Sequence, residues 1–218
     1  MSATSGPGTL SLSEEKKELT RDRIRRAAQA MLAEHGLRAT VEDIARAAGV
    51  SARTVFRHYP SHDELVAQSL TMMFDELGRP VDGLPDPLVD LRGWLEMLAL
   101  SAHTRSAKVL GKAFWDIHNP GENPSPVVLR ALAKRKPLRR HRTDSIAEQA
   151  WIAAGGTGTP PGTVSESFGL HFSGYATRAL AVDYRKTPEG VARLTTDVLM
   201  AVLGQAVDEQ RRIESNAD

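Results

Sequence analysis

The stretch over residues 40–65 constrains the fold of this chain most, because its capping residues and turn glycine define two short helices. Thr40 opens the first helix as an N-cap, with Asp43 three residues later as its capping-box partner. Gly49 ends that helix at a point where a left-handed residue is needed. Ser51 caps the second helix, which begins at the next residue. Two helices joined by a turn this tight predict a helix-turn-helix.

The second of these helices, over residues 52–59, divides its side chains between two faces. Val55 and Tyr59 share one face, and the other carries polar and cationic side chains: Arg53, Thr54, Arg57 and His58. The major groove of DNA is wide enough for one helix, and arginine can donate two hydrogen bonds to a guanine edge. The sequence therefore predicts that residues 52–59 form the reading helix of a DNA-binding motif.

The pattern AxxxLAExGLRATxxDIAxxAGVSxRTVFRHYPSxDEL, within residues 20–66, resembles the DNA-binding domain of the TetR family of transcriptional regulators. The resemblance is specific because caps, turn glycine, apolar positions and reading helix arrive in register. It implies an all-α fold of about nine helices, in which a three-helix DNA-binding domain precedes a larger helical domain for effector binding and dimerisation. The predicted domains are residues 14–66, with the helix-turn-helix at about 43–62, and residues 67–213, between tails at 1–13 and 214–218.

The resemblance also implies which residues contact DNA, and two of them depart from the family pattern. Phe56 stands where the family usually has tyrosine, so the hydroxyl contact to the DNA backbone is lost. His62 stands where the family usually has lysine, and a neutral imidazole is a weaker phosphate partner than an ammonium group. The predicted DNA contacts are Thr40, Ser51, Ala52, Arg53, Thr54, Phe56, Arg57, His58 and His62.

The first predicted helix, over residues 14–34, carries an apolar stripe made of Leu19, Ile24, Ala27, Ala28, Met31 and Leu32. Its arginines at 21, 23, 25 and 26 are interpreted as a solvated face, with phosphate contact by one or two of them as the alternative. Further helices are predicted over residues 61–77, 88–101, 107–117, 127–153, 165–182 and 188–213. Loops rich in glycine and proline separate them at residues 78–87, 118–126 and 155–162.

The last two predicted helices each carry a continuous apolar face with small residues beside it. Packing within one subunit is one interpretation of these faces, and a four-helix dimer seam is the other. The resemblance favours the dimer, and a two-fold dimer would read two half-sites of a palindromic operator on double-stranded DNA. The predicted interface residues are Phe168, Phe172, Tyr175, Leu194, Val198 and Val202.

The second domain holds aromatic, methionine and histidine side chains, most of which are interpreted as core. Some are expected to line a cavity for a small apolar effector, as the resemblance implies. The candidates are Trp94, Met97, His103, Phe114, Trp115, His118 and Trp151. A basic run from Lys134 to Arg142 is interpreted as a solvated helix face, with an anionic ligand or a partner protein as the alternative.

Composition and motifs narrow the function further. The 218 residues contain no cysteine, and lysine plus arginine nearly balance aspartate plus glutamate, 28 against 27. No nucleophile motif, phosphate-binding glycine loop or paired-carboxylate site is present, so no enzyme, cofactor or metal is predicted. Without a membrane-length apolar run or signal peptide, the expected location is cytoplasmic.

We expect a homodimeric repressor that a small effector releases from DNA. An activator or a regulator without effector is the first alternative. A helical enzyme or an interaction scaffold is the alternative from another class.

Overall fold

The computed structural model describes residues 11–118 and 125–216, and this part of the chain consists of helices, turns and loops without strands. The helices are α1 (Leu12–His35), α2 (Val41–Ala48), α3 (Ala52–His58), α4 (His62–Leu77), α5 (Leu91–Leu110), α6 (Ala113–His118), α7 (Pro126–Ala153), α8 (Gly162–His171), α9 (Gly174–Val182) and α10 (Pro188–Ser215), with a short 3-10 helix, η1 (Gly36–Arg38), after α1. The all-α prediction is confirmed. The described residues form ten α-helices, one more than expected.

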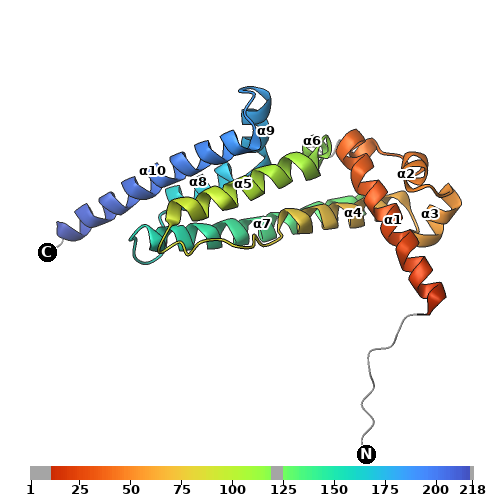
Figure 1. The fold of residues 1–218 in the computed structure, drawn as a ribbon, viewed down its shortest axis with the longest axis horizontal. Helices are drawn as coiled ribbons and strands as arrows, with labels where there is room; N and C mark the ends of the chain where they lie inside the picture. Colours follow the sequence, from red (N-terminus) through yellow and green to blue (C-terminus); the bar gives the residue numbers. More distant parts are fainter. Residues whose placement is uncertain (1–10, 119–124, 217–218) are drawn as a thin grey trace, which may run out of the picture.

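The helices form a small N-terminal group at one end of a long bundle (Figure 1). Helices α1 to α3 make up the small group, and α4 runs from it into the bundle alongside α7. In the bundle α10 packs mainly along α5, while α8 packs between α7 and α10. One continuous helix, α4, therefore connects the two parts.

A separate hydrophobic core holds the small N-terminal group together. Ile24 of α1, Ile44 of α2, Val55 of α3 and Leu65 of α4 are almost completely buried and pack in one cluster. Tyr59, which follows α3, is fully buried in the same cluster. Both apolar faces predicted for the helix-turn-helix are thus directed inward, and the opposite face of α3 is left for solvent.

The end of α1 docks onto the α5–α6 corner of the bundle through two hydrogen bonds donated by backbone N–H groups. The Lys112 N–H donates to the Ala33 carbonyl oxygen over 2.7 Å, and the Leu37 N–H donates to Asp116 Oδ2 over 2.7 Å. Gly111 has a φ of +45°, and a Cβ there would lie 2.2 Å from the Ala33 oxygen. Glycine at this position therefore permits the close approach of α5–α6 to α1.

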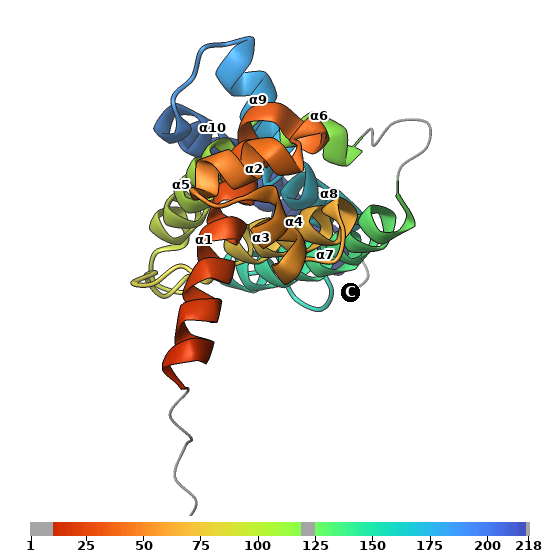
Figure 2. The same ribbon diagram turned by 90° about the vertical axis from the view of Figure 1, so that its right-hand side faces the viewer.

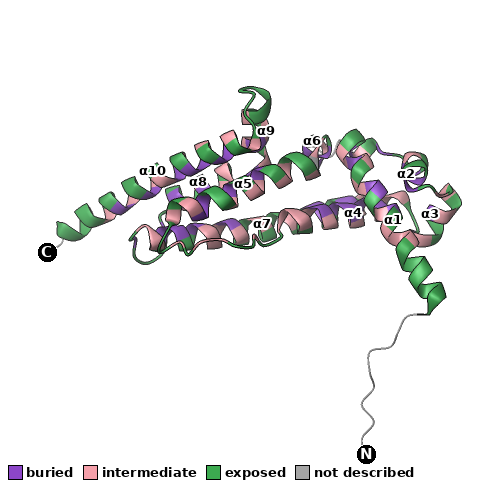
Figure 3. Cartoon of the chain, viewed as in Figure 1, coloured by how far each residue is buried: buried purple, intermediate pink, exposed green. Residues whose placement is uncertain are grey.

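The beginning of α1 differs from prediction. Ser11 is its N-cap and forms a capping box with Glu14, so residues 11–13 belong to an ordered helix start and not to a tail. Residues 1–10 of the expected tail lie outside the described residues. Leu19 is 63% exposed, because the first half of α1 extends past the N-terminal core (Figure 2 and Figure 3). Its place in the predicted apolar stripe was wrong.

Four helices predicted for the second part have different bounds in the structure. A single helix, α5, replaces the predicted 88–101 segment and the first part of the 107–117 segment. It begins after Asp90, whose side chain caps Gly93 N–H, and Leu88 before it is 70% exposed. The predicted helix over 165–182 is two helices, because α8 ends at His171 and Ser173 caps the start of α9. Helix α10 reaches Ser215, inside the expected C-terminal tail.

Helix α10 contains a stretch that is long and apolar enough to span a membrane by length and composition alone. Leu199 and Leu203 on this helix are almost completely buried against α5 and α8. Part of its apolar character is therefore explained by its place in the core of the bundle.

Candidate DNA interface and effector cavity

The reading helix α3 is fixed by a turn and a cap of the kinds that the sequence predicted. Gly49 adopts the left-handed conformation, with φ 62° and ψ 39°. The Ser51 hydroxyl oxygen accepts from the Thr54 N–H over 3.2 Å, and the two hydroxyl oxygens lie 3.0 Å apart. These contacts use the polar atoms of Ser51 and Thr54 within the helix start.

The outward face of α3 carries the side chains suited to a DNA groove. Arg53 and Arg57 are exposed, Phe56 is 49% exposed, and Ala52 beside them is half-buried. Within residues 11–118 and 125–216 neither arginine forms an ion pair with a carboxylate. Two guanidinium groups and an aromatic ring are therefore available to base edges and phosphates.

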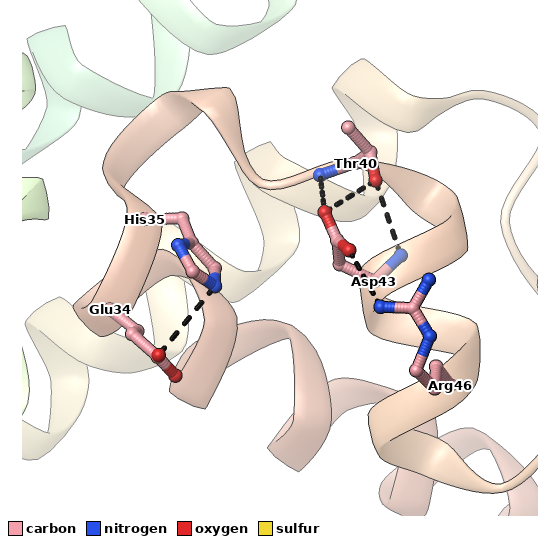
Figure 4. A network of polar contacts seen from close by, with 5 residues as sticks. All are labelled: Glu34, His35, Thr40, Asp43 and Arg46. Carbon is pink, nitrogen blue, oxygen red and sulfur yellow. Dashed lines mark hydrogen bonds and ion pairs between the residues drawn. The ribbon is translucent and has the colours of Figure 1, made fainter.

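Thr40 serves chiefly as the cap of α2 (Figure 4). Its hydroxyl donates to Asp43 Oδ2 over 2.6 Å and accepts from the Asp43 N–H over 3.2 Å. These hydrogen bonds hold the pKa of the Asp43 carboxyl below its usual value, with a smaller contribution from Arg46, which is 3.1 Å away. Beside this network Nε2 of His35 lies 3.8 Å from Oε1 of Glu34. The Thr40 hydroxyl thus has protein partners for both its proton and its lone pair.

His58, at the end of α3, lies close to cations of α1. Burial lowers the pKa of His58, and the charges of Arg57, Lys17 and Arg21 lower it further. The Arg21 guanidinium also lies over the Tyr59 ring, 5.6 Å from its centroid. The structure therefore adds Lys17 and Arg21 to the cationic surface beside α3, which agrees with the alternative that one or two of the α1 arginines contact phosphate.

His62 is turned toward the protein. Its Nε2 lies 2.7 Å from the Ala39 carbonyl oxygen, and its Nδ1 lies 3.6 Å from a carboxylate oxygen of Asp63. The first contact ties the start of α4 to the segment that precedes α2. The imidazole thus supports the domain at the position where the family resemblance implies a phosphate-binding cation.

The aromatic side chains that were proposed to bind an effector are mostly core. Trp94, Phe114 and Trp151 are almost completely buried in two core clusters. Met97 and Trp115 are exposed on the outside of the bundle. None of these side chains lines the cavity described below, whereas Trp151 lines a second cavity with Val202 and Ala206 of α10.

The two histidines of the same list make polar contacts inside the bundle. His103 is buried, with Nδ1 2.8 Å from the Thr177 hydroxyl and Nε2 3.0 Å from the Thr195 hydroxyl. Burial, with a smaller effect of His171, lowers the pKa of His103 to about 4. His118 Nε2 lies 3.4 Å from Nη1 of Arg135, so this histidine contacts a cavity residue without lining the cavity. His103 is therefore a neutral link between α5, α9 and α10.

A cavity of about 190 Å³ lies between α4, α5, α7 and the α8–α9 turn, and we call it the α4–α7 cavity. One part of its wall is apolar and includes Phe74, Leu77, Leu98, Ile146 and Phe172. Another part is cationic and contains Arg79, Arg105, Lys134, Arg135, Arg139 and Arg142. Asp75 contributes a carboxylate to the same wall.

The cationic wall comes largely from the basic run that the sequence interpretation assigned to solvent. Arg135, Arg139 and Arg142 are half-buried, in contrast to the exposed Lys136 and Arg140 of the same helix. Spacings of four and three residues place these three arginines on one face of α7. This periodicity was present in the sequence and could have distinguished them from their solvated neighbours.

The predicted dimer residues occupy different environments. Phe168 is fully buried in its own subunit and stacks on Phe172, with ring centroids 6.0 Å apart. Tyr175 is 46% exposed and belongs to an aromatic cluster with Phe114 and His118. The three predicted interface residues of α10 remain partly exposed: Leu194, Val198 and Val202.

A comparison with models of known protein families gives a match for the N-terminal domain. Residues 24–68 match the family model of bacterial regulatory proteins, tetR family. None of the curated proteins matches the chain significantly in sequence.

Solved structures match almost the whole chain. A tetR-family transcriptional regulator from Streptomyces coelicolor is 16% identical, with a TM-score of 0.62 over 91% of this chain and 86% of that one. A transcriptional regulator from Rhodococcus is 24% identical, with a TM-score of 0.56 over 86% of this chain and 97% of that one. The fatty acid degradation regulator FadR from Bacillus halodurans is 16% identical, with a TM-score of 0.58 over 84% and 98%. At these identities the likeness shows the fold.

A capped helix-turn-helix with an open cationic face, joined by one helix to a larger helical domain, defines a DNA-binding transcription regulator. The DNA-binding domain is that of the TetR family, and the chain has the fold of TetR-family regulators. These matches support a DNA-binding transcription regulator. Within the described residues no group of three potential metal-binding side chains occurs.

Proposed function

We propose that the protein is a homodimeric repressor that binds a palindromic operator in the cytoplasm and is released from it by a small-molecule effector. The observation that carries the DNA-binding part is the outward face of α3, where Arg53, Phe56 and Arg57 project from a helix that is capped and anchored by Val55. Arg53 and Arg57 are the proposed base or phosphate contacts, and Phe56 fits a thymine methyl group.

The remaining predicted contacts take supporting roles in this proposal. Ser51 and Thr40 cap α3 and α2, and Thr54 hydrogen-bonds to the Ser51 cap, so these residues hold the backbone amides of the helix starts toward a phosphate. His58 contacts a phosphate together with the α1 cations, while His62 positions α4. Sequence selection comes from the arginines, and the capping residues fix the register of the domain on the duplex.

The proposed domains meet within α4. Residues 14–66 form the DNA-binding domain and residues 67–213 the effector-binding and dimerisation domain. The α4–α7 cavity is the proposed effector site, because Phe74 and Leu77 of its wall belong to the helix that begins in the DNA-binding domain. An effector must bind the DNA-free arrangement more tightly than the DNA-bound one to act as a switch. Moving α4 then changes the separation of the two reading helices.

The test of this function is selection of bound DNA from a random duplex library with the wild-type protein and with Arg57→Ala. A two-fold symmetric consensus is expected, and the variant should bind it about 5- to 150-fold more weakly, corresponding to about 1–3 kcal/mol. Arg140→Ala is the matched control, because Arg140 is an exposed arginine on α7 that pairs with Asp144. Absence of any enriched sequence at moderate salt would remove the regulator function.

A further inference from the structure

The α4–α7 cavity carries more positive charge than its own residues compensate. Its cationic side chains face the single carboxylate of Asp75 in the described wall. Arg79 is compensated by Glu76, 2.7 Å away on α4. Across residues 11–118 and 125–216, the guanidinium groups of Arg105, Arg135 and Arg139 have no carboxylate within ion-pair distance.

These arginines are held in place by neutral groups. Arg139 Nη1 donates to the Gly169 carbonyl oxygen over 2.9 Å, and Arg105 donates to the carbonyl oxygens of Arg79 and Pro80. The Arg135 guanidinium lies 5.4 Å from the centroid of the Phe74 ring. Carbonyl oxygens and a ring face orient a guanidinium group but do not neutralise its charge.

Burial and the closeness of these guanidinium groups to one another lower the pKa of two of them. Burial lowers the pKa of Arg135 below its usual value, and the charge of Arg139 lowers it further. Burial and the charges of Arg139 and Arg105 do the same to the pKa of Arg142. Like charges held together in a partly buried site favour a bound anion, because the anion offsets both the repulsion and the lost hydration.

The geometry of the wall also indicates the rest of the ligand. Beside the arginines the cavity wall also carries apolar side chains, and its volume of about 190 Å³ is small beside the roughly 300–1,000 Å³ of pockets for drug-sized ligands. A compact molecule with one anionic group and a short apolar body matches both parts of the wall. Carboxylates and phosphate esters each accept two parallel hydrogen bonds from a guanidinium group.

We infer that the α4–α7 cavity binds a small organic anion, a carboxylate or a phosphate ester with an apolar body, and that this anion is the effector. The effector role of this anion rests on the proposed function. The binding of the anion is inferred from the cavity alone.

Helix α4 provides the route from anion to DNA. The side chain of Arg135 stacks on Phe74 of α4, and the Arg142 guanidinium packs against Gly78 at the end of this helix. A Cβ at Gly78 would lie 2.4 Å from Arg142 Nη1, so glycine leaves room for the charged group. An anion that draws Arg135 and Arg142 into the cavity would change both contacts with α4.

The test compares charged probes with neutral molecules of the same shape. Benzoate, phenylacetate, hexanoate and phenyl phosphate are each added to the full-length protein, with benzamide, phenylacetamide and hexanamide as neutral counterparts. Thermal unfolding reports binding, because a ligand that binds the native state raises the Tm. At least one anion is expected to raise the Tm with an apparent Kd at least tenfold below that of its amide. Comparing the three carboxylates with phenyl phosphate shows which anionic group the cavity binds more tightly.

Two arginine variants separate the cavity from general charge effects. Arg139→Gln should weaken binding of the preferred anion at least tenfold, while Arg140→Gln, at the exposed neighbouring position, should leave it unchanged. Equal stabilisation by anions and amides, or equal loss in both variants, would overturn the inference. Failure of every anion to raise the Tm would overturn it as well.

DNA release distinguishes the effector role from anion binding. Fluorescence anisotropy of the selected operator should show that the preferred anion lowers affinity for DNA in the wild type but not in Arg139→Gln. An anion that binds the cavity and leaves DNA affinity unchanged overturns the effector role and keeps the binding site. If no operator is selected at all, the proposed regulator function fails while the anion site is still decided by the Tm series.

Discussion

His103 shows at the scale of one residue how burial changes what a side chain does. The sequence suggested an effector ligand, but the imidazole is enclosed between the hydroxyls of Thr177 and Thr195, with a pKa of about 4. When the pH falls below the ordinary imidazole pKa of about 6.5, His103 binds a proton in the unfolded chain but stays neutral in the folded chain. Stability should therefore fall as pH falls from 6.5 toward 4.

The prediction for His103 is a loss of about 2 kcal/mol in the free energy of unfolding between pH 7 and pH 5. Urea unfolding at both pH values measures it, and His103→Asn should lose most of this pH dependence. His141→Asn, at an exposed position on α7, should retain it. An unchanged pH dependence in the His103 variant would show that other groups cause the slope.

His58 gives a second prediction, which concerns DNA binding. In the free protein burial and the cations Arg57, Lys17 and Arg21 keep its pKa low, and a DNA phosphate would raise it. The complex then binds more protons than the free protein, so operator affinity should rise as pH falls through the usual imidazole range. The expected gain is about tenfold for each unit by which DNA raises the pKa. Anisotropy titrations from pH 7.5 to 5.5 measure it, and the gain should disappear in His58→Gln but persist in His35→Gln.

Elements differ in how far their sequence could predict them. The helix-turn-helix was predicted well, because Thr40, Gly49 and Ser51 are local signals that act within a few residues. The split between α8 and α9 was missed, since Ser173 is one weak cap inside an apolar run. Most residues that line the α4–α7 cavity were missed for another reason: an aromatic type such as Trp94 indicates burial, and only the packing of whole helices decides between core and cavity wall.

The contact between α1 and the α5–α6 corner carries a prediction at the scale of elements. Asp116 accepts the Leu37 N–H, and a Cβ at Gly36 would lie 1.9 Å from Asp116 Oδ2. Asp116→Ala should leave this amide without its partner and lower the free energy of unfolding by about 1–3 kcal/mol. Asp144→Ala removes an exposed ion-pair partner instead and should change stability by less than about 1 kcal/mol. Equal urea midpoints for both variants would show that the corner contact adds nothing.

At the scale of the whole molecule, one row of apolar side chains on α10 is not fully covered by the rest of the subunit. Leu194 and Val198 are only partly buried and are not among the residues that pack on the described core clusters. Leu170 of α8, which packs beside α10, is 60% exposed. Phe168, in contrast, is fully buried in the core of its own subunit and cannot contact a second copy. If two copies pair, this open part of α8 and α10 is the surface that fits the proposed seam.

Val198→Glu therefore tests the proposed dimer. A carboxylate buried in an apolar seam is costly, so the variant should be monomeric in light scattering at concentrations where the wild type is dimeric. Because two linked reading helices bind far more tightly than one, operator affinity should fall about 100-fold or more. Arg193→Glu adds a carboxylate at an exposed position of the same helix and should keep both the dimer and DNA binding. A dimeric Val198→Glu protein with wild-type operator affinity would place the seam elsewhere, and a monomeric wild type that binds DNA would remove the need for one.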